Sequence, residues 1–83
     1  MYEILLLPSA QRDLDFLEKK IFLQVTRRLS DLAGNPRIQG CQKLTVEEGY
    51  RLRSGDYRIL YRIDDAGKKV YVYRIKHRKD VYR

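Results

Sequence analysis

The chain has little of what metal, redox and nucleotide-cofactor sites need. Its 83 residues include one cysteine, Cys41, and one histidine, so no internal disulfide can form and no ligand spacing typical of zinc occurs. Neither a P-loop nor a Gly-x-Gly-x-x-Gly motif is present, and no motif surrounds a Ser-His-Asp combination. We therefore expect no metal site and no cofactor.

Long apolar runs are also missing. No run approaches the roughly 18 residues that a membrane-spanning helix needs, and the start, Met-Tyr-Glu, lacks the regions of a signal peptide. Together with the lone Cys41, these features favour the cytoplasm. Repeats, low-complexity tracts and linkers are absent, and the length suits one modest core. We expect a single domain over residues 1–83 and no association with membranes.

Positive charge is confined to the last part of the chain. Residues 51–83 hold 11 Lys and Arg against 4 Asp and Glu, a net charge of +7, whereas residues 1–50 hold 7 of each. A pI near 9.8 is typical of nucleic-acid binding. The basic residues lie in strand-like sequence, which argues against a basic helix on a membrane surface.

A β-hairpin is predicted where the arginines cluster. Residues 50–62 alternate between polar and apolar, the period of a half-buried strand, and Gly55-Asp56 is a two-residue turn signal in which glycine takes positive φ. Pairing 54 with 57 places four apolar residues on one face and four arginines on the other: Tyr50, Leu52, Ile59 and Tyr61 against Arg51, Arg53, Arg58 and Arg62. Opposed arginines repel, so such a row indicates that the protein binds a polyanion.

The remaining pattern predicts an α+β fold. A strand over 2–7 precedes Ser9, a suitable N-cap, and two apolar stripes predict two helices that meet near residues 19–21 and end at Gly34-Asn35-Pro36. A short strand over 42–46, hairpin strands over 50–54 and 57–64, and a last strand over 69–76 follow. The order β-α-α-β-β-β predicts an antiparallel-dominated twisted sheet with two helices packed on one face.

Cleavage of RNA suits the side chains gathered at this end of the chain. RNA supplies its own nucleophile, the 2′-OH, so the enzyme must align it, move two protons and stabilise the crowded phosphorane. Arginine forks bind phosphate, histidine carries protons near neutral pH, and nearby cations favour a tyrosine phenolate. Solvated strand faces and C-terminal packing are the simpler interpretations of the same residues. The candidates are Arg51, Arg53, Arg58, Arg74, His77, Arg78 and Tyr82.

Two segments of the chain resemble the RelE toxins of the RelE/ParE superfamily. One runs from residue 50 to 64 and includes Gly-Asp-Tyr-Arg at 55–58; the other runs from 72 to 83 and includes His-Arg-Lys-Asp-Val-Tyr at 77–82. The likeness extends over the whole chain. It implies a RelE-like fold and a cytoplasmic toxin that cuts mRNA in the ribosomal A site without a metal and that an antitoxin holds inactive.

The resemblance also implies roles for individual residues. Arg58 matches the arginine that stabilises the phosphate, Arg78 the arginine after the last strand, and Tyr82 the C-terminal tyrosine implicated in proton transfer. The stretch between Arg78 and Tyr82 is shorter than in the best-known members, and His77 has no counterpart in them, so the general base is Tyr82 or His77. The residues expected to bind RNA or the ribosome are Arg51, Arg53, Arg74, Lys76 and Lys79.

The expected partners are macromolecules. We expect an acidic antitoxin that covers the cationic face, together with the ribosome and mRNA. The toxin alone is expected to be a monomer that forms larger assemblies with its antitoxin. Two alternatives remain: a ParE-like inhibitor of DNA gyrase without nuclease activity, and a ribosome- or RNA-binding module that does not cleave.

Overall fold

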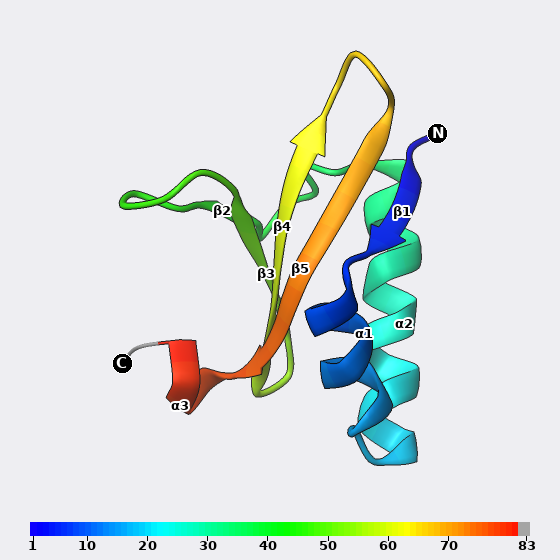
Figure 1. Cartoon of the computed structure of the whole chain (residues 1–83), viewed down its shortest axis with the longest axis vertical. Coiled ribbons are helices and arrows are strands. Elements are labelled where there is room, and N and C mark those ends of the chain that lie inside the picture. The colour runs from blue at the N-terminus through cyan, green and yellow to red at the C-terminus, as the bar shows by residue number, and fades with distance from the viewer. Residues whose placement is uncertain (82–83) are drawn as a thin grey trace.

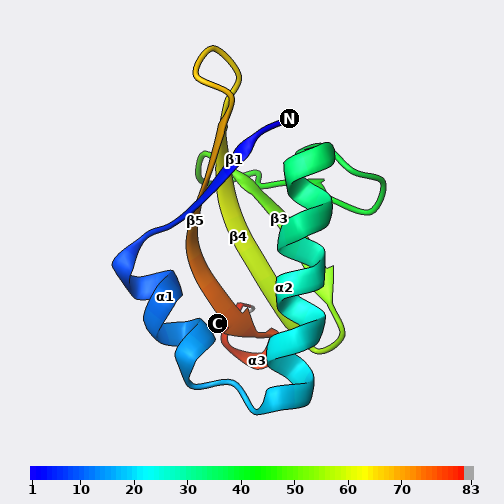
Figure 2. The same cartoon turned by 90° about the vertical axis from the view of Figure 1, so that its right-hand side faces the viewer.

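Two helices cover one face of a five-stranded sheet (Figures 1 and 2). The computed structural model describes residues 1–81. The elements along the chain are β1 (Glu3–Leu6), α1 (Pro8–Asp15), α2 (Lys19–Gly34), β2 (Gln42–Lys43), β3 (Tyr50–Ser54), β4 (Tyr57–Asp64), β5 (Lys69–His77) and α3 (Arg78–Val81). The predicted α+β class is confirmed, as are two helices on one sheet face.

The sheet is antiparallel except at one edge. Its strand order is β1-β5-β4-β3-β2; β1 runs parallel to β5, and the other three neighbouring pairs are antiparallel. The longest strand, β5, therefore lies between the first strand and the hairpin. This arrangement places the basic C-terminal half of the chain across most of the sheet.

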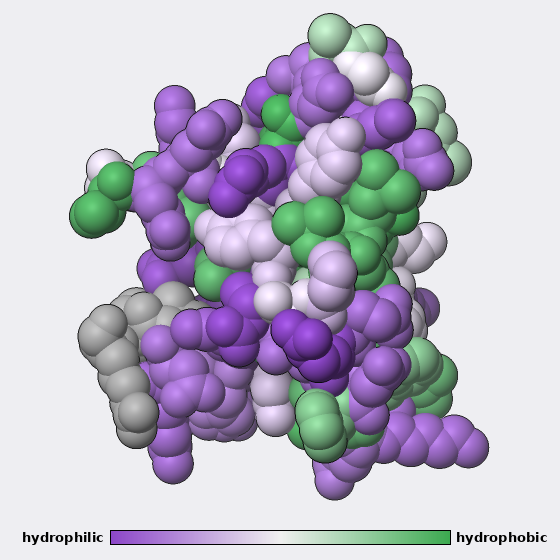
Figure 3. All heavy atoms as spheres, viewed as in Figure 1, coloured by the Kyte–Doolittle hydropathy of each residue, from purple (hydrophilic) through white to green (hydrophobic). Residues whose placement is uncertain are grey.

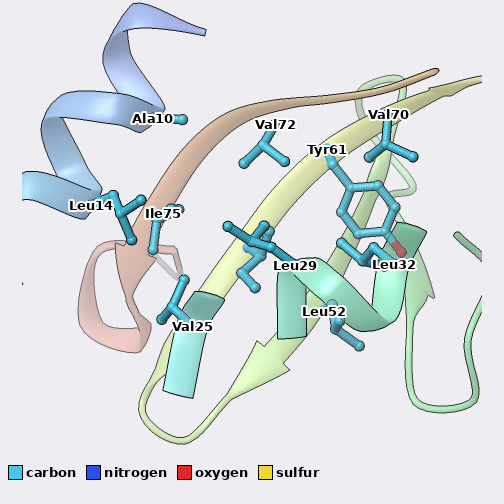
Figure 4. Packing of buried hydrophobic residues seen from close by; sticks show 11 residues of the cluster. Ala10, Leu14, Val25, Leu29, Leu32, Leu52, Tyr61, Val70, Val72 and Ile75 are labelled. Atoms are coloured by element: carbon cyan, nitrogen blue, oxygen red, sulfur yellow. The ribbon is translucent and has the colours of Figure 1, made fainter. Parts of the chain in front are cut away.

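The hydrophobic core fills the space between the helices and the sheet (Figure 4). Its only buried aromatic ring among the described residues is that of Tyr61, which is 0% exposed. The Tyr61 hydroxyl donates a hydrogen bond of 2.7 Å to the carbonyl oxygen of Pro36, and burial raises the pKa of this phenol. The other members are Ala10, Leu14, Val25, Leu29, Leu32, Leu52, Ile59, Val70, Val72 and Ile75.

The helix boundaries differ in detail from those predicted. Helix α1 has Leu7, in extended conformation, as its N-cap and Pro8 in its first turn, so the prediction of Ser9 as N-cap is wrong. Proline suits the first helical turn because its φ is already helical and the missing N–H would have no partner there. The break between the helices falls at residues 16–18, slightly before the expected position, and α2 ends at Gly34 as predicted.

The hairpin formed by β3 and β4 has the predicted register. Ser54 pairs with Tyr57 and Arg53 with Arg58, and Gly55 adopts a φ of 59°. Other strand boundaries differ from the prediction: β1 covers 3–6, β2 covers only 42–43, and β5 extends to residue 77. The short helix α3 was not predicted.

A β-bulge in β5 changes which side chains face the helices. Leu60 pairs with Arg74 and Tyr61 with Val72, which leaves Tyr73 without an opposite residue. The bulge adds one residue to the alternation of side chains. After Val72, the next side chain of β5 that faces the helices is therefore that of Ile75 and not that of Arg74. Every later side chain in β5 thus lies on the face opposite to the one that strict alternation gives.

An ion pair fastens the β4–β5 turn to the loop after α2. The Arg37 guanidinium donates to both carboxylate oxygens of Asp65, at 3.0 and 2.9 Å, and the Tyr2 hydroxyl donates to the same carboxylate at 2.7 Å. Both donors lower the pKa of Asp65, to about 2, and Arg37 contributes more than Tyr2.

No helix among residues 1–81 is both long and apolar enough to cross a membrane.

Candidate nucleic-acid interface

The sheet face opposite α1 and α2 is cationic, and we call it the open face. Alternation along β3, β4 and β5 places Arg51, Arg58 and Lys76 on it. The loop over 44–49 and helix α3 both project from this side of the sheet (Figure 1), and the side chains visible on this side of the molecule are mostly hydrophilic (Figure 3). The open face thus lies between two projecting segments, the loop over 44–49 and helix α3.

Arg58 is the most deeply placed cation of the open face. It is 7% exposed, and its Nη1 donates to the carbonyl oxygens of Gly55 at 3.2 Å and Tyr57 at 3.1 Å. Arg53 Nε donates to the same Gly55 oxygen at 3.2 Å. Among residues 1–81, no carboxylate lies within 4.0 Å of the Arg58 guanidinium. A buried charge without a counter-ion favours an anionic ligand.

Three arginines line one hollow, which we call the arginine recess. Its lining residues are Gly40, Gln42, Arg51, Arg53 and Arg58, and its volume is about 240 Å³. The Gln42 side-chain oxygen accepts from Arg51 Nε at 3.0 Å and from Arg51 Nη2 at 2.7 Å, which orients that guanidinium. No carboxylate lines this recess, so its chemistry suits phosphate.

A neighbouring hollow contains both charges and apolar side chains, and we call it the mixed recess. It has a volume of about 300 Å³ and shares Arg51 with the arginine recess. Lys76, which pairs with Arg58 across the β4–β5 ladder, lines it too. Its other lining residues are Leu44, Thr45, Val46, Glu47, Leu60 and Asp80.

His77 does not line the arginine recess with Arg51, Arg53 and Arg58. It pairs with Tyr57 in the ladder, and the two rings meet edge to face with centroids 5.2 Å apart. Both line a hollow with Lys20 and Ile21 of α2, so the imidazole lies on the helix side of the sheet. The sequence-based grouping of His77 with Arg58 is therefore wrong, and the bulge at Tyr73 is the physical reason. The His77 Nδ1 accepts a hydrogen bond of 3.3 Å from the Lys79 N–H.

Arg74 is engaged in a contact within the fold. Its guanidinium donates to both oxygens of Asp13, at 2.7 and 3.2 Å, and the Asp13 carboxylate raises the pKa of Arg74. The Ile75 N–H donates to Asp13 as well, at 2.9 Å. Asp13 thus ties α1 to the part of β5 that extends past β1. No pattern in the sequence indicates this contact, because 61 residues separate the two partners.

The remaining predicted residues lie near the end of β5. The Arg78 N–H donates to the Asp56 carbonyl at 2.7 Å, and its Nε is 3.8 Å from the Asp56 carboxylate, so Arg78 lies beside the hairpin turn. Lys79 is exposed on α3. Tyr82 lies outside the described residues. In the described part of the chain, no group of three or more His, Cys, Asp or Glu is placed to hold a metal ion.

Fold and open face together define a small basic α+β protein with a cationic sheet face, and comparisons with known proteins show its family. The family model described as "ParE toxin of type II toxin-antitoxin system, parDE" matches residues 4–82. Toxin RelG of Mycobacterium tuberculosis is 34% identical over 84 residues, covering 99% of this chain and 97% of the relative. Toxin RelE of the same organism is 33% identical, covering 99% and 87%.

A solved structure gives the same result. The chain matches the toxin–antitoxin complex RelBE2 of M. tuberculosis with a TM-score of 0.82 and 34% identity, over 92% of this chain and 96% of that one. The chain belongs to the RelE family of the RelE/ParE toxin superfamily. It is the toxin component of a toxin–antitoxin system.

Proposed function

We propose that this toxin is a metal-independent endoribonuclease that cleaves mRNA in the A site of the ribosome. The observation that carries the proposal is the environment of Arg58: a guanidinium that is 7% exposed, with no carboxylate partner in the described chain, beside two further arginines in one recess. A buried cation without a counter-ion destabilises the fold, whereas it can stabilise the negative charge of a phosphorane.

The proposed reaction is an internal phosphoryl transfer. The ribose 2′-oxygen attacks the phosphorus, the bond to the 5′-oxygen breaks, and the products are a 2′,3′-cyclic phosphate and a 5′-hydroxyl. A base accepts the 2′-OH proton and an acid donates a proton to the leaving oxygen. Arg58 stabilises the charge of the phosphorane, and Arg51 and Arg53 hold the phosphate through their forks.

The position of His77 changes the proposed assignment of proton transfer. Because His77 lies on the helix side of the sheet, it does not face a phosphate held by Arg58. We therefore assign the general base to Tyr82, which rests on the family resemblance, and propose that Arg78 adds a phosphate contact. Arg74 is assigned a structural role because Asp13 occupies its fork.

The proposed partners follow from the charge of the open face and from the relatives. Similar solved structures include complexes of RelE toxins with their antitoxins from M. tuberculosis and Escherichia coli. We propose that an acidic antitoxin segment covers the open face here, that the free toxin is a monomer, and that it acts on ribosomes in the cytoplasm. Lys76 and Lys79 would add contacts to RNA.

The test is the appearance of new mRNA 5′ ends. Purified toxin is added to a translation extract with ribosomes stalled at a defined codon, and the ends are mapped by primer extension in the presence of a chelator. We expect cuts within the A-site codon that are absent when ribosomes are omitted. Toxin binding without new 5′ ends would instead identify a non-cleaving module.

One observation favours a second candidate, because the matching family model is described as a ParE toxin. A ParE-like protein would inhibit DNA gyrase and leave mRNA intact. A supercoiling assay with purified gyrase distinguishes the two functions. Inhibition at toxin concentrations that leave programmed mRNA uncut would replace the nuclease proposal.

A further inference from the structure

We infer that the mixed recess holds a nucleobase next to the phosphate and prefers a base with an exocyclic amino group to uracil. This inference rests on the proposed function, because it assigns a subsite to the same RNA-binding face. The residues that carry it are Leu44, Glu47 and Arg51 with Leu60, Lys76 and Asp80. Two carboxylates, Glu47 and Asp80, line this recess, so it suits a phosphate less well than the arginine recess does.

The apolar side chains fit the flat face of a base. Leu60, 8% exposed, forms part of the floor, and Leu44 and Val46 come from the projecting loop. A volume of about 300 Å³ lies at the lower end of small-molecule sites, roughly 300–1,000 Å³. Val46 is 98% exposed, so its apolar surface is available to a ligand.

The loop is held in place by its backbone. The Leu44 N–H donates to the Gly49 carbonyl at 2.9 Å, which closes the loop at its base. Gly49 has a φ of 128°, and a Cβ there would lie 2.8 Å from the Tyr61 carbonyl oxygen. Only glycine therefore lets the chain return this close to β4, and the return sets Glu47 at the recess.

The carboxylates give the recess a preference among bases. Neither Glu47 nor Asp80 has an ion pair within the described chain, so both remain available as hydrogen-bond acceptors. Carboxylates accept from the exocyclic amino group of cytosine, and adenine and guanine carry amino groups as well. At position 4 uracil has a carbonyl oxygen instead of an amino group, which a carboxylate repels, so the only donor on its pairing edge is the ring N3–H. Lys76 supplies a donor for a ring acceptor.

The position of the recess matches the layout of a nucleotide. Arg51 lines both hollows, so a phosphate in the arginine recess lies next to a base in the mixed recess. The first hollow has arginines and no carboxylate, and the second has apolar walls and two carboxylates. This division of chemistry separates a phosphate site from a base site.

Nucleotide titration tests the inference without requiring cleavage. Isotope-labelled toxin is titrated with cytidine 5′-monophosphate and with uridine 5′-monophosphate, whose bases differ only at ring positions 3 and 4. We expect shifts at the methyl groups of Leu44, Val46 and Leu60 with the cytidine nucleotide, and binding at least about fivefold tighter than that of the uridine nucleotide.

Two variants on one loop provide the matched control. Glu47→Gln should bring the two affinities within about twofold, because the amide both donates and accepts. Glu48→Gln removes the same charge from the adjacent position, which does not line the recess, and should keep the preference. Equal affinities in the wild type, no shift with either nucleotide, or equal effects of the two variants would overturn the inference.

The outcome is separable from that of the proposed function. A toxin that leaves mRNA intact on ribosomes yet prefers the cytidine nucleotide would contradict the nuclease proposal and retain the base site. A toxin that cuts mRNA but shows no preference would retain the nuclease and overturn the base site. Loss of antitoxin affinity in Glu47→Gln, together with equal binding of the two nucleotides by the wild-type toxin, would assign the recess to a protein partner and overturn the base site as well.

Discussion

Arg53 and Arg58 lie directly opposite each other in the β3–β4 hairpin and donate to one oxygen, the carbonyl of Gly55, each at 3.2 Å. Like charges placed opposite in a sheet repel. The shared acceptor offsets part of that repulsion and aims both guanidinium groups at the arginine recess. The hairpin turn thus organises the anion site as well as reversing the chain.

Gly55→Ala should weaken the fold through the turn. Gly55 has a φ of 59°, and a Cβ would meet only the Gln24 side-chain oxygen, at 3.8 Å, so the cost is conformational, about 1 kcal/mol. Urea denaturation measures the change in unfolding free energy. Gly34→Ala is the control, because nothing lies within 4 Å of that site and its φ is not positive. Equal effects at the two glycines would contradict this reading of the turn.

Arg74→Ala should act on stability and leave RNA contacts unchanged. Its loss leaves the Asp13 carboxylate short of two donors, which costs about 1–3 kcal/mol for a charged hydrogen-bonded pair. Denaturant unfolding gives that number. The salt dependence of binding to single-stranded RNA should match the wild type, whereas Arg53→Ala should reduce the slope by about 0.7. A reduced slope in Arg74→Ala would restore its role as an RNA contact.

The Asp65 ion pair predicts a pH dependence of stability. The pKa of Asp65 is about 2 in the folded chain, below the ordinary value near 3.9. A depressed carboxyl pKa stabilises the fold above the unfolded value, and this contribution is lost as pH falls through about 2. The difference in unfolding free energy between wild type and Asp65→Asn should be constant above about pH 5 and shrink towards pH 2. A difference that does not change with pH would exclude this ion pair as its source.

Antitoxin capture should depend on salt. The positive charge lies in residues 51–83, and complementary charge speeds association. Stopped-flow association with the antitoxin should slow as ionic strength rises, and Arg51→Gln with Arg53→Gln should weaken that dependence. The same rate at low and high salt would rule out an electrostatic encounter on the open face.

The hairpin was predictable because local rules determine it. Alternation of period two and a Gly-Asp turn set the register, and a shift of one residue would have placed the arginines in the core. The two helices followed from apolar spacing in the same way. Helix α3 is the four-residue stretch Arg-Lys-Asp-Val, which is too short to show any such pattern, and it was missed.

Long-range and irregular features limited the prediction of the site. The bulge at Tyr73 has no turn residue to mark it, yet it moves His77 to the helix side and Arg74 away from the core. The Asp13–Arg74 pair joins α1 to β5 across the whole middle of the chain. The predicted pairing of 54 with 57 also sets Leu60 opposite Arg51, but the place of Leu60 in a recess depends on the loop over 44–49.

The central claim is tested most directly by single-turnover cleavage on programmed ribosomes with Arg58→Ala, Arg58→Lys and the control Arg27→Ala, an exposed arginine on α2. Thermal unfolding first establishes that all three variants fold. The account predicts a loss of roughly 100-fold or more for Arg58→Ala, partial recovery with lysine because a point charge replaces a fork, and the wild-type rate for the control. Cleavage at the wild-type rate by folded Arg58→Ala would contradict it.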